Sequence, residues 1–385
     1  MLIYFCIFFG LAILGLFIKP YPENSYLLLR DRMNLNFVFF LLFLFFTIFI
    51  GLRHNIGGDY GQYRFIYGLH QEMSFFESLL PSANSSDPGF GILNWMVHQV
   101  DPFESIYWNY FHRVGGYNIV NLVCAAIFCL FFLKFAFNLP RPFLILTLSF
   151  PYLIIVVSMG YVRQGIAIAI IAQAIILLGQ SRKLWFIVLV LLATSIHKSA
   201  IIFFPLVAYV STSNKYLLAI IGVAFFGFVG FVLLASQVER LVSVYIGQEI
   251  QSRGAQMRIA LLLPSALIYL IYKKKFIFSE YQHKIYSFFA ITTVIMFISV
   301  ISFASGFSTS LDRIALYYLP FQVMIFSYLP EMFAKKNAFF VTLLIIIYFF
   351  LLMTVWLVFA DNSSAWVPYK SLLYLDFHSI NYVTK

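Results

Sequence analysis

The sequence predicts an all-α polytopic integral membrane protein, with about 12 transmembrane helices and short interfacial helices in one large outward-facing loop. The first observation is composition, because 62% of the 385 residues are hydrophobic, 20% are aromatic and only 10% are charged, beyond what a soluble core uses. The second is the length of the apolar runs, which favours helices over the alternating strands of a membrane barrel. We expect one polytopic domain over residues 1–385.

The predicted spans are runs of roughly 20 mostly apolar residues, the length that crosses a bilayer. They cover residues 2–18, 35–52, 117–135, 142–159, 163–179, 184–197, 199–211, 216–235, 257–272, 285–304, 312–330 and 338–360. The large loop is 53–116, where we expect two short amphipathic helices that lie at the outer interface, one starting near Asp59 and one near Asp87.

Lysine and arginine in the loops indicate the orientation, since basic residues accumulate on the cytoplasmic side. With the N-terminus outside, the inside segments hold fourteen bases and four acids, a difference equal to the net charge of +10. The C-terminus then also lies outside, and 53–116 faces outward. Topology and anionic lipid account for the basic excess, so we expect no nucleic-acid partner.

The cysteines suggest no metal site and no disulfide. Cys6, Cys124 and Cys129 all fall within predicted spans, where a thiol behaves as a small apolar residue. No CxxC, HExxH or phosphate-binding glycine-rich loop occurs in the sequence, so we expect no metal and no cofactor.

Arginines beside the predicted spans are the candidates for binding. Arg163 stands between two apolar runs with almost no loop to solvate it, a costly position that favours a partner or a polar cavity. A guanidinium there is either a residue that reaches the outer headgroups or a clamp for phosphate oxygens. Arg53 and Arg313 have the same character at other span ends, and Lys198 follows a very short span. Scattered interfacial cations are the alternative to one anion site.

Acidic, histidine and tyrosine side chains accompany these cations. His197 precedes Lys198 where the chain turns back between two short spans, either lining a cavity or capping a helix in water. Asp59 suits a helix N-cap after Gly57-Gly58, and Asp87 before Pro88-Gly89 suits a turn. The tyrosines of the loop are an aromatic belt or a stacking surface for sugars; they are Tyr60, Tyr63 and Tyr67.

Six short segments together resemble the EpsG family of polytopic bacterial proteins, which is grouped with Wzy-type polymerases of O-antigen and exopolysaccharide. They are RHNIGGDYGQY, DPGFGILNW, MGYVRQGIAIAI, HKSAIIFFP, DRIALYYLP and WVPYKSLL, spread over about residues 53–373. No single motif is specific, but their order and spacing are. One departure is DPGF, where the family often has glutamate before the proline.

The resemblance implies a membrane glycosyltransferase of the bacterial inner membrane that needs no metal. It would move a growing glycan from undecaprenyl diphosphate to another lipid-linked repeat unit on the periplasmic face, and a regulator of chain length would be a candidate partner. Arg53, Arg163, Arg313 and Lys198 would hold diphosphate, and Tyr60, Tyr63 and Tyr67 would bind sugar. The candidate catalytic residues on the acceptor side would be Asp59, Asp87 and His197, with Asp59 preferred as base.

Two other functions fit the same residues. A transporter of lipid-linked or anionic glycan would also need a cationic site, although its ionisable groups would lie near the bilayer midplane within repeated halves. A ligase that passes the finished glycan to another acceptor would share the donor chemistry. The sequence separates it from a polymerase only through the family resemblance.

Overall fold

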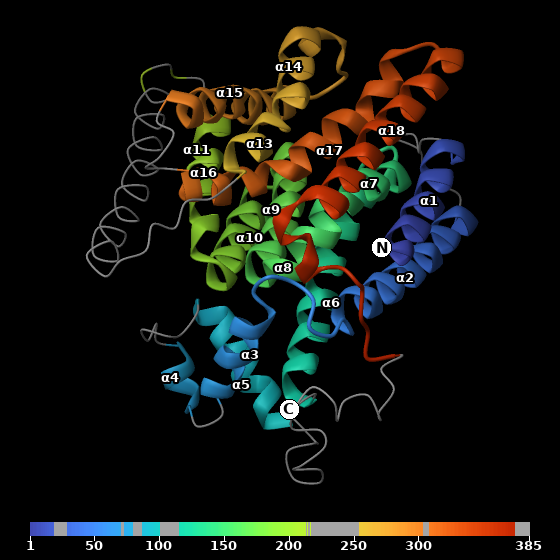
Figure 1. The fold of residues 1–385 in the computed structure, drawn as a ribbon. Coiled ribbons are helices and arrows are strands. Elements are labelled where there is room, and N and C mark those ends of the chain that lie inside the picture. Colours follow the sequence, from blue (N-terminus) through green and yellow to red (C-terminus); the bar gives the residue numbers. More distant parts are fainter. Residues whose placement is uncertain are drawn as a thin grey trace. The chain divides into compact units, whose positions relative to one another are not determined.

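The computed structural model is all-helical in its described parts, which are residues 1–18, 29–70, 73–79, 87–100, 115–212, 214, 216, 254–302 and 308–373 (Figure 1). The contacts divide the chain into two compact units. Unit 1 is 1–170, 192–198 and 342–385, and unit 2 is 171–191 and 199–341. The expectation of a single domain stays a prediction.

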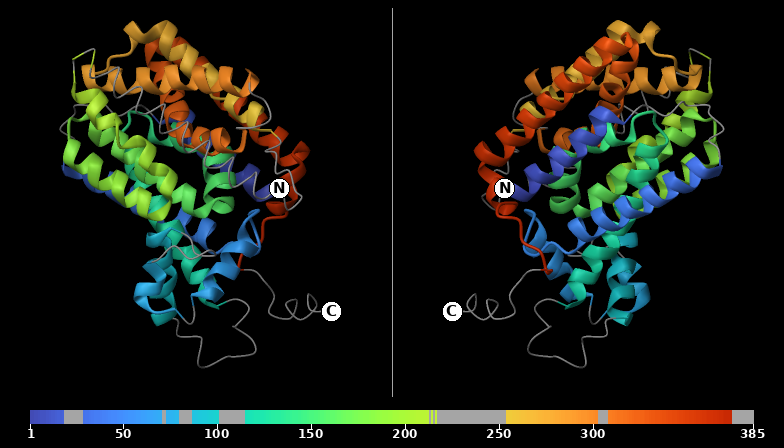
Figure 2. Two further views of the ribbon diagram at one scale, coloured as in Figure 1. Left: turned by 90° about the vertical axis from the view of Figure 1, so that its left-hand side faces the viewer. Right: turned by 90° about the vertical axis from the view of Figure 1, so that its right-hand side faces the viewer.

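Unit 1 begins with α1 (Leu2–Phe17) and α2 (Leu29–Gly51), and continues through three shorter helices, α3 (Tyr60–Leu69), α4 (Phe75–Leu79) and α5 (Pro88–Val100). α6 (Gly115–Phe137) packs along α2, and α7 (Pro142–Ser149) packs along α1. α3 and α5 pack on α6, and α4 packs on α5, so the three short helices form one group (Figure 2). The helices expected to start near Asp59 and Asp87 are therefore confirmed.

The chain then reaches the start of α9 through an irregular stretch. α7 runs into a π-helical segment, Phe150–Val157, which is followed by the short α8 (Ser158–Gly160) and then by α9 (Val162–Gly179). α10 (Lys183–Ile196) ends in unit 1, and so does α18 (Lys335–Phe359), after which a 3-10 turn covers Asp361–Ala365.

Unit 2 holds the later helices. Its elements after α10 are a 3-10 turn over Lys198–Phe203, of which Lys198 belongs to unit 1, α11 (Leu206–Ser211), α13 (Ala255–Ala260), α14 (Leu263–Tyr272), α15 (Glu280–Ser302), α16 (Ser308–Ala315) and α17 (Leu319–Tyr328). α14 packs on α15 and α17, and α13 packs on α16. An aromatic cluster joins this group, in which the Phe289 ring stacks on that of Phe321 and meets Tyr318 edge-on.

Six helices of the described chain are long and apolar enough to cross a membrane, so the prediction of a helical membrane protein is confirmed, whereas the count of about 12 spans is not. They are 116–137, 142–160, 162–179, 255–275, 280–302 and 337–359. Shorter apolar helices cover 2–17, 36–51, 183–196 and 198–211. Of the predicted span 216–235, residues 217–235 lie outside the described residues. The predicted span 312–330 is divided into α16, α17 and 3-10 turns, because Pro320 and Pro330 supply no backbone N–H to a regular helix.

The turn after α2 is held by the segment that follows α18. The His54 N–H donates to the Lys370 carbonyl at 3.0 Å, and the Leu372 N–H donates to the Leu52 carbonyl at 2.8 Å. Gly57 has a φ of 104°, and a Cβ there would lie 2.3 Å from the Met159 carbonyl oxygen. Glycine is thus required at this position both by its backbone conformation and by the close approach.

Gly57→Ala is expected to destabilise the protein by roughly 1 kcal/mol or more, because alanine is strained at positive φ and its methyl group meets backbone. Thermal unfolding of the detergent-purified protein would report the change as a lower midpoint. Gly61→Ala is the matched control, since it lies within α3 with nothing within 4 Å of the added carbon. Equal midpoints for the two variants would contradict the proposed constraint.

Candidate active site around Asp87

The start of α5 lies directly against the end of α10. Asp87 precedes α5, and its carbonyl accepts hydrogen bonds from the N–H groups of Phe90 and Gly91 at 3.0 and 3.1 Å. A Cβ on Gly89 would lie 2.7 Å from Ser195 Oγ and 2.9 Å from the Ser195 carbonyl oxygen. Only glycine allows this approach, which brings the Asp87 carboxylate to the chain that follows Ser195.

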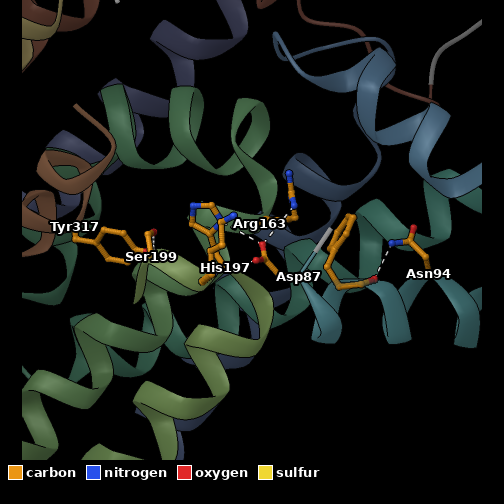
Figure 3. Close-up of polar contacts among 8 residues, drawn as sticks. Asp87, Asn94, Arg163, His197, Ser199 and Tyr317 are labelled. Atoms are coloured by element: carbon orange, nitrogen blue, oxygen red, sulfur yellow. Dashed lines mark hydrogen bonds and ion pairs between the residues drawn. The ribbon is translucent and has the colours of Figure 1, made fainter. Parts of the chain in front are cut away.

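The Asp87 carboxylate joins three groups from distant parts of unit 1 (Figure 3). Its Oδ2 lies 3.3 Å from Arg163 Nη1 and 3.4 Å from His197 Nδ1. Its Oδ1 accepts a hydrogen bond from the Lys198 backbone N–H at 3.2 Å. Only 9% of the Asp87 side chain is exposed, so these contacts replace most of the water that would otherwise solvate its charge.

Two aromatic rings hold the Arg163 guanidinium. Its central carbon lies 5.6 Å from the centre of the Tyr63 ring and 5.7 Å from that of Phe90, both within the range of a cation–π attraction. Arg163 Nε is buried and has no hydrogen-bond partner among the described residues. Because the side chain keeps 23% exposure, it combines a fixed position with donor capacity for a further anion.

The electrostatic balance keeps Asp87 ionised. Burial acts to raise the pKa of its carboxyl group, but the contact with His197, the charge of Arg163 and the Lys198 N–H outweigh burial, and the pKa lies below its ordinary value. A carboxylate whose pKa is lowered by such contacts is a weak base. Asp87 is therefore better suited to orienting His197 and Arg163 than to accepting a proton.

Arg53, a predicted diphosphate ligand, lies inside unit 1 with 1% of its surface exposed. Its guanidinium donates to the Ile50 carbonyl at 2.7 Å, to the Ile56 carbonyl at 3.3 Å and to Asn121 Oδ1 at 3.1 Å. A cation that bonds a carbonyl in the last turn of α2 is favourably placed in the helix dipole. These contacts connect the end of α2 to the turn that follows it and to α6. We do not include Arg53 in the candidate site, and its predicted diphosphate role stays a prediction.

The other predicted cations differ in setting. Lys198 has an exposed side chain and gives its backbone N–H to Asp87. Arg313 is exposed on α16, in unit 2. Its neighbour Asp312 accepts two hydrogen bonds of 2.5 Å from Arg258. The diphosphate role of Arg313 stays a prediction. Arg240 and Arg253, which precede Arg258 in the sequence, lie outside the described residues.

The three tyrosines lie on α3 at the predicted helical spacing, and each packs within unit 1. Tyr60 is buried and donates to Asn118 Oδ1 at 3.3 Å. Tyr63 is buried beside Arg163, and Tyr67 stacks on His98 with ring centres 3.9 Å apart. Their role in sugar binding stays a prediction.

Asp59 immediately precedes α3, as predicted. The pKa of the Tyr63 hydroxyl is raised, mainly because the group is buried. The charge of Arg163 acts to lower this pKa, and the charge of the Asp59 carboxylate acts to raise it. Both charged groups therefore act on the same phenol, which places Asp59 near the candidate site. Its role as base stays a prediction.

Sequence reasoning missed the aromatic support of Arg163. Phe90 stands two residues after the proline of DPGF, and Tyr63 stands in DYGQY, so both belong to recognisable segments. Nothing in either segment indicates that its ring contacts an arginine far along the chain. Among the described residues, no three His, Cys, Asp or Glu side chains are grouped so that they could hold a metal ion.

Comparison with known proteins supports the resemblance noted in the sequence. The model of the EpsG family matches residues 36–371, most of the chain. No curated protein matches, and no solved structure does.

Asp87→Asn is expected to remove a pH-dependent part of the stability. Because the folded pKa of Asp87 is lowered, its contribution is present above the ordinary pKa of about 3.9 and is lost as the pH falls through the folded pKa. Melting midpoints from about pH 7 to about pH 3 would show wild type above the variant at first and converging with it in acid. Asp361→Asn removes an exposed carboxylate and is the control. A gap between wild type and Asp87→Asn that persists unchanged in acid would contradict the assignment.

Proposed function

The chain belongs to the EpsG family, and from this premise we propose that it is the membrane polymerase of a bacterial surface polysaccharide. In the proposed reaction a growing glycan leaves undecaprenyl diphosphate and joins another lipid-linked repeat unit. The observation that carries the proposal is Arg163, which is fixed by two rings and by Asp87 and yet keeps 23% of its side chain exposed.

The leaving group determines what the site must supply. When the bond between the anomeric carbon and the diphosphate oxygen breaks, negative charge grows on the diphosphate. Cations already held in position stabilise such charge in the transition state better than water does. Arg163 offers planar donors matched to phosphate oxygens, and Lys198 offers a mobile ammonium group on an exposed side chain. In this proposal the two residues hold the departing diphosphate, and the chemistry needs no metal.

The acceptor hydroxyl must lose a proton as it attacks. Nδ1 of His197 faces Asp87, and a proton on Nδ1 directed to that carboxylate leaves Nε2 as the basic nitrogen. We assign His197 as the general base and Asp87 as the residue that orients it, in place of Asp59, the base preferred from sequence. Nε2 takes the hydroxyl proton, the oxygen attacks the anomeric carbon, and the diphosphate leaves with the bonding electrons.

The remaining features of the proposal concern the membrane. We propose about 12 spans in the inner membrane, with both termini and the site on the periplasmic side. Basic loops are expected on the opposite face. The donor and the acceptor are both lipid-linked oligosaccharides, and a regulator of chain length is a candidate partner.

Arg163→Ala is expected to leave single repeat units on cells that lack the native protein, since losing one preorganised donor costs roughly 10²–10³-fold in rate. Polysaccharide length on a gel is the measurement, with wild type, Arg163→Ala, Arg163→Lys and Arg182→Ala returned separately. Arg163→Lys keeps the charge without the planar fork and should restore chains only in part. Arg182→Ala, which removes an exposed arginine from unit 2, should restore full length.

The same cells distinguish the other functions when the membrane side of the repeat units and the lipid linkage of the chains are also measured. Full-length chains from Arg163→Ala would contradict the anion role. Repeat units stranded on the cytoplasmic side in the absence of the protein would favour a transporter. Long chains that remain lipid-linked would favour a ligase.

His197→Ala is expected to lower kcat by roughly 10²–10⁴-fold, the usual contribution of a positioned base. Polymerisation by the purified protein with lipid-linked repeat units would measure this across pH. The acidic limb of the wild-type profile should disappear in the variant, and added imidazole should restore part of the rate. An unchanged acidic limb in His197→Ala would assign the base to another residue.

A further inference from the structure

The segment WVPYKSLL has no part in the proposed chemistry, yet it contacts residues more than 300 positions away in the sequence. The Tyr4 hydroxyl donates to the Trp366 carbonyl at 2.9 Å, and the Gly57 N–H donates at 2.9 Å to the carbonyl of Ala365, the residue just before the segment. Further along, the Tyr369 hydroxyl donates to the Phe49 carbonyl at 2.7 Å. The segment thus joins the first helix, the end of α2 and the turn that follows α2.

The indole of Trp366 lies against the irregular stretch before α9. Only 3% of Trp366 is exposed, and its Nε1–H donates to the Ile155 carbonyl, in the π-helical segment, at 3.0 Å. A Cβ on Gly160 would lie 2.3 Å from the indole atom Cζ2. The ring therefore occupies the space that a side chain on Gly160 would need. Trp356 meets the same ring edge-on, with centres 5.2 Å apart.

The contact with Gly160 bears directly on Arg163. Tyr161 is the non-helical link after Gly160, with φ −117° and ψ 60°. The Tyr161 carbonyl accepts the Gly165 N–H at 2.7 Å, and Arg163 is the second residue of α9. The direction in which α9 starts is therefore set by how the chain is held at Ile155 and Gly160, the two points that Trp366 contacts.

We propose that Trp366 is a positioning residue for Arg163: its indole, hydrogen-bonded to Ile155 and packed on Gly160, aims the guanidinium at the diphosphate. The inference rests on the proposed function, because it assigns Arg163 to that anion. Trp366 itself does not touch the substrate. Its effect on activity acts through the geometry of one turn.

The test uses full-length protein in detergent and farnesyl diphosphate as the probe, with affinity measured by calorimetry. Trp366→Phe keeps an aromatic ring but removes the N–H and the atoms nearest Gly160. We expect its Kd to rise roughly tenfold. This change is smaller than the ~10²-fold loss of reaction rate that a 1 Å misplacement can cause. Tyr369→Phe is the matched control, because it removes one hydrogen bond of the same segment and should leave the Kd unchanged at a similar melting midpoint.

A double-mutant cycle separates positioning from general stability. If Trp366 acts through Arg163, then Trp366→Phe combined with Arg163→Lys should bind no more weakly than Arg163→Lys alone. Gly160→Ala should weaken binding by itself, and Trp366→Phe should restore part of that loss by making room for the methyl group.

Three results would overturn the inference: wild-type affinity in Trp366→Phe, losses that add in full in the double variant, or no restoration of Gly160→Ala. The failure of the proposed function looks different. In that case Arg163→Lys and Arg163→Ala would bind the probe as wild type does, or wild type would not bind it, and the inference would fall with the anion site.

Discussion

The arrangement of unit 1 depends on the cost of a charged side chain away from water. Asp87 is almost fully enclosed and ionised, so it needs donors within reach, and these come from the start of α9 and the chain after α10. Removing one partner of such a pair leaves an uncompensated charge, which is far more costly than the pair itself is favourable. The carboxylate therefore determines how closely α5, α9 and α10 approach one another at this point.

Arg53 meets the same constraint by another route. Two main-chain carbonyls and an asparagine oxygen accept hydrogen bonds from its guanidinium. The two arginines therefore differ in how their guanidinium groups are hydrogen-bonded. Each guanidinium nitrogen of Arg53 donates one hydrogen bond, whereas Nε of Arg163 has no hydrogen-bond partner among the described residues. This difference is the reason that the proposed anion site includes Arg163 and not Arg53, although both stand at the end of an apolar run in the sequence.

Local patterns predicted most of the helices, because apolar runs and starting residues are local signals. α4 was missed, although Ser74 and Glu77 form the reciprocal bonds of a capping box, a four-residue pattern that could have revealed it. The candidate site was predicted as a set of residues and not as an arrangement. Asp87 meets Arg163 and His197 across 76 and 110 residues, and such pairings depend on tertiary packing, which one sequence does not show.

The tryptophan at the far end of the chain has a consequence for synthesis. Its bond to Ile155 spans 211 positions, so the turn before α9 enters the membrane long before the indole that supports it has left the ribosome. Chains grow from the N-terminus at about 5–20 residues per second, which separates the two events by roughly ten seconds or more. A nascent chain that ends before Trp366 would already contain Asp87 and the groups that contact its carboxylate. It would lack the indole that packs on the turn before α9. If Trp366 positions Arg163 as proposed, completion of the site is coupled to synthesis of the segment that contains this tryptophan.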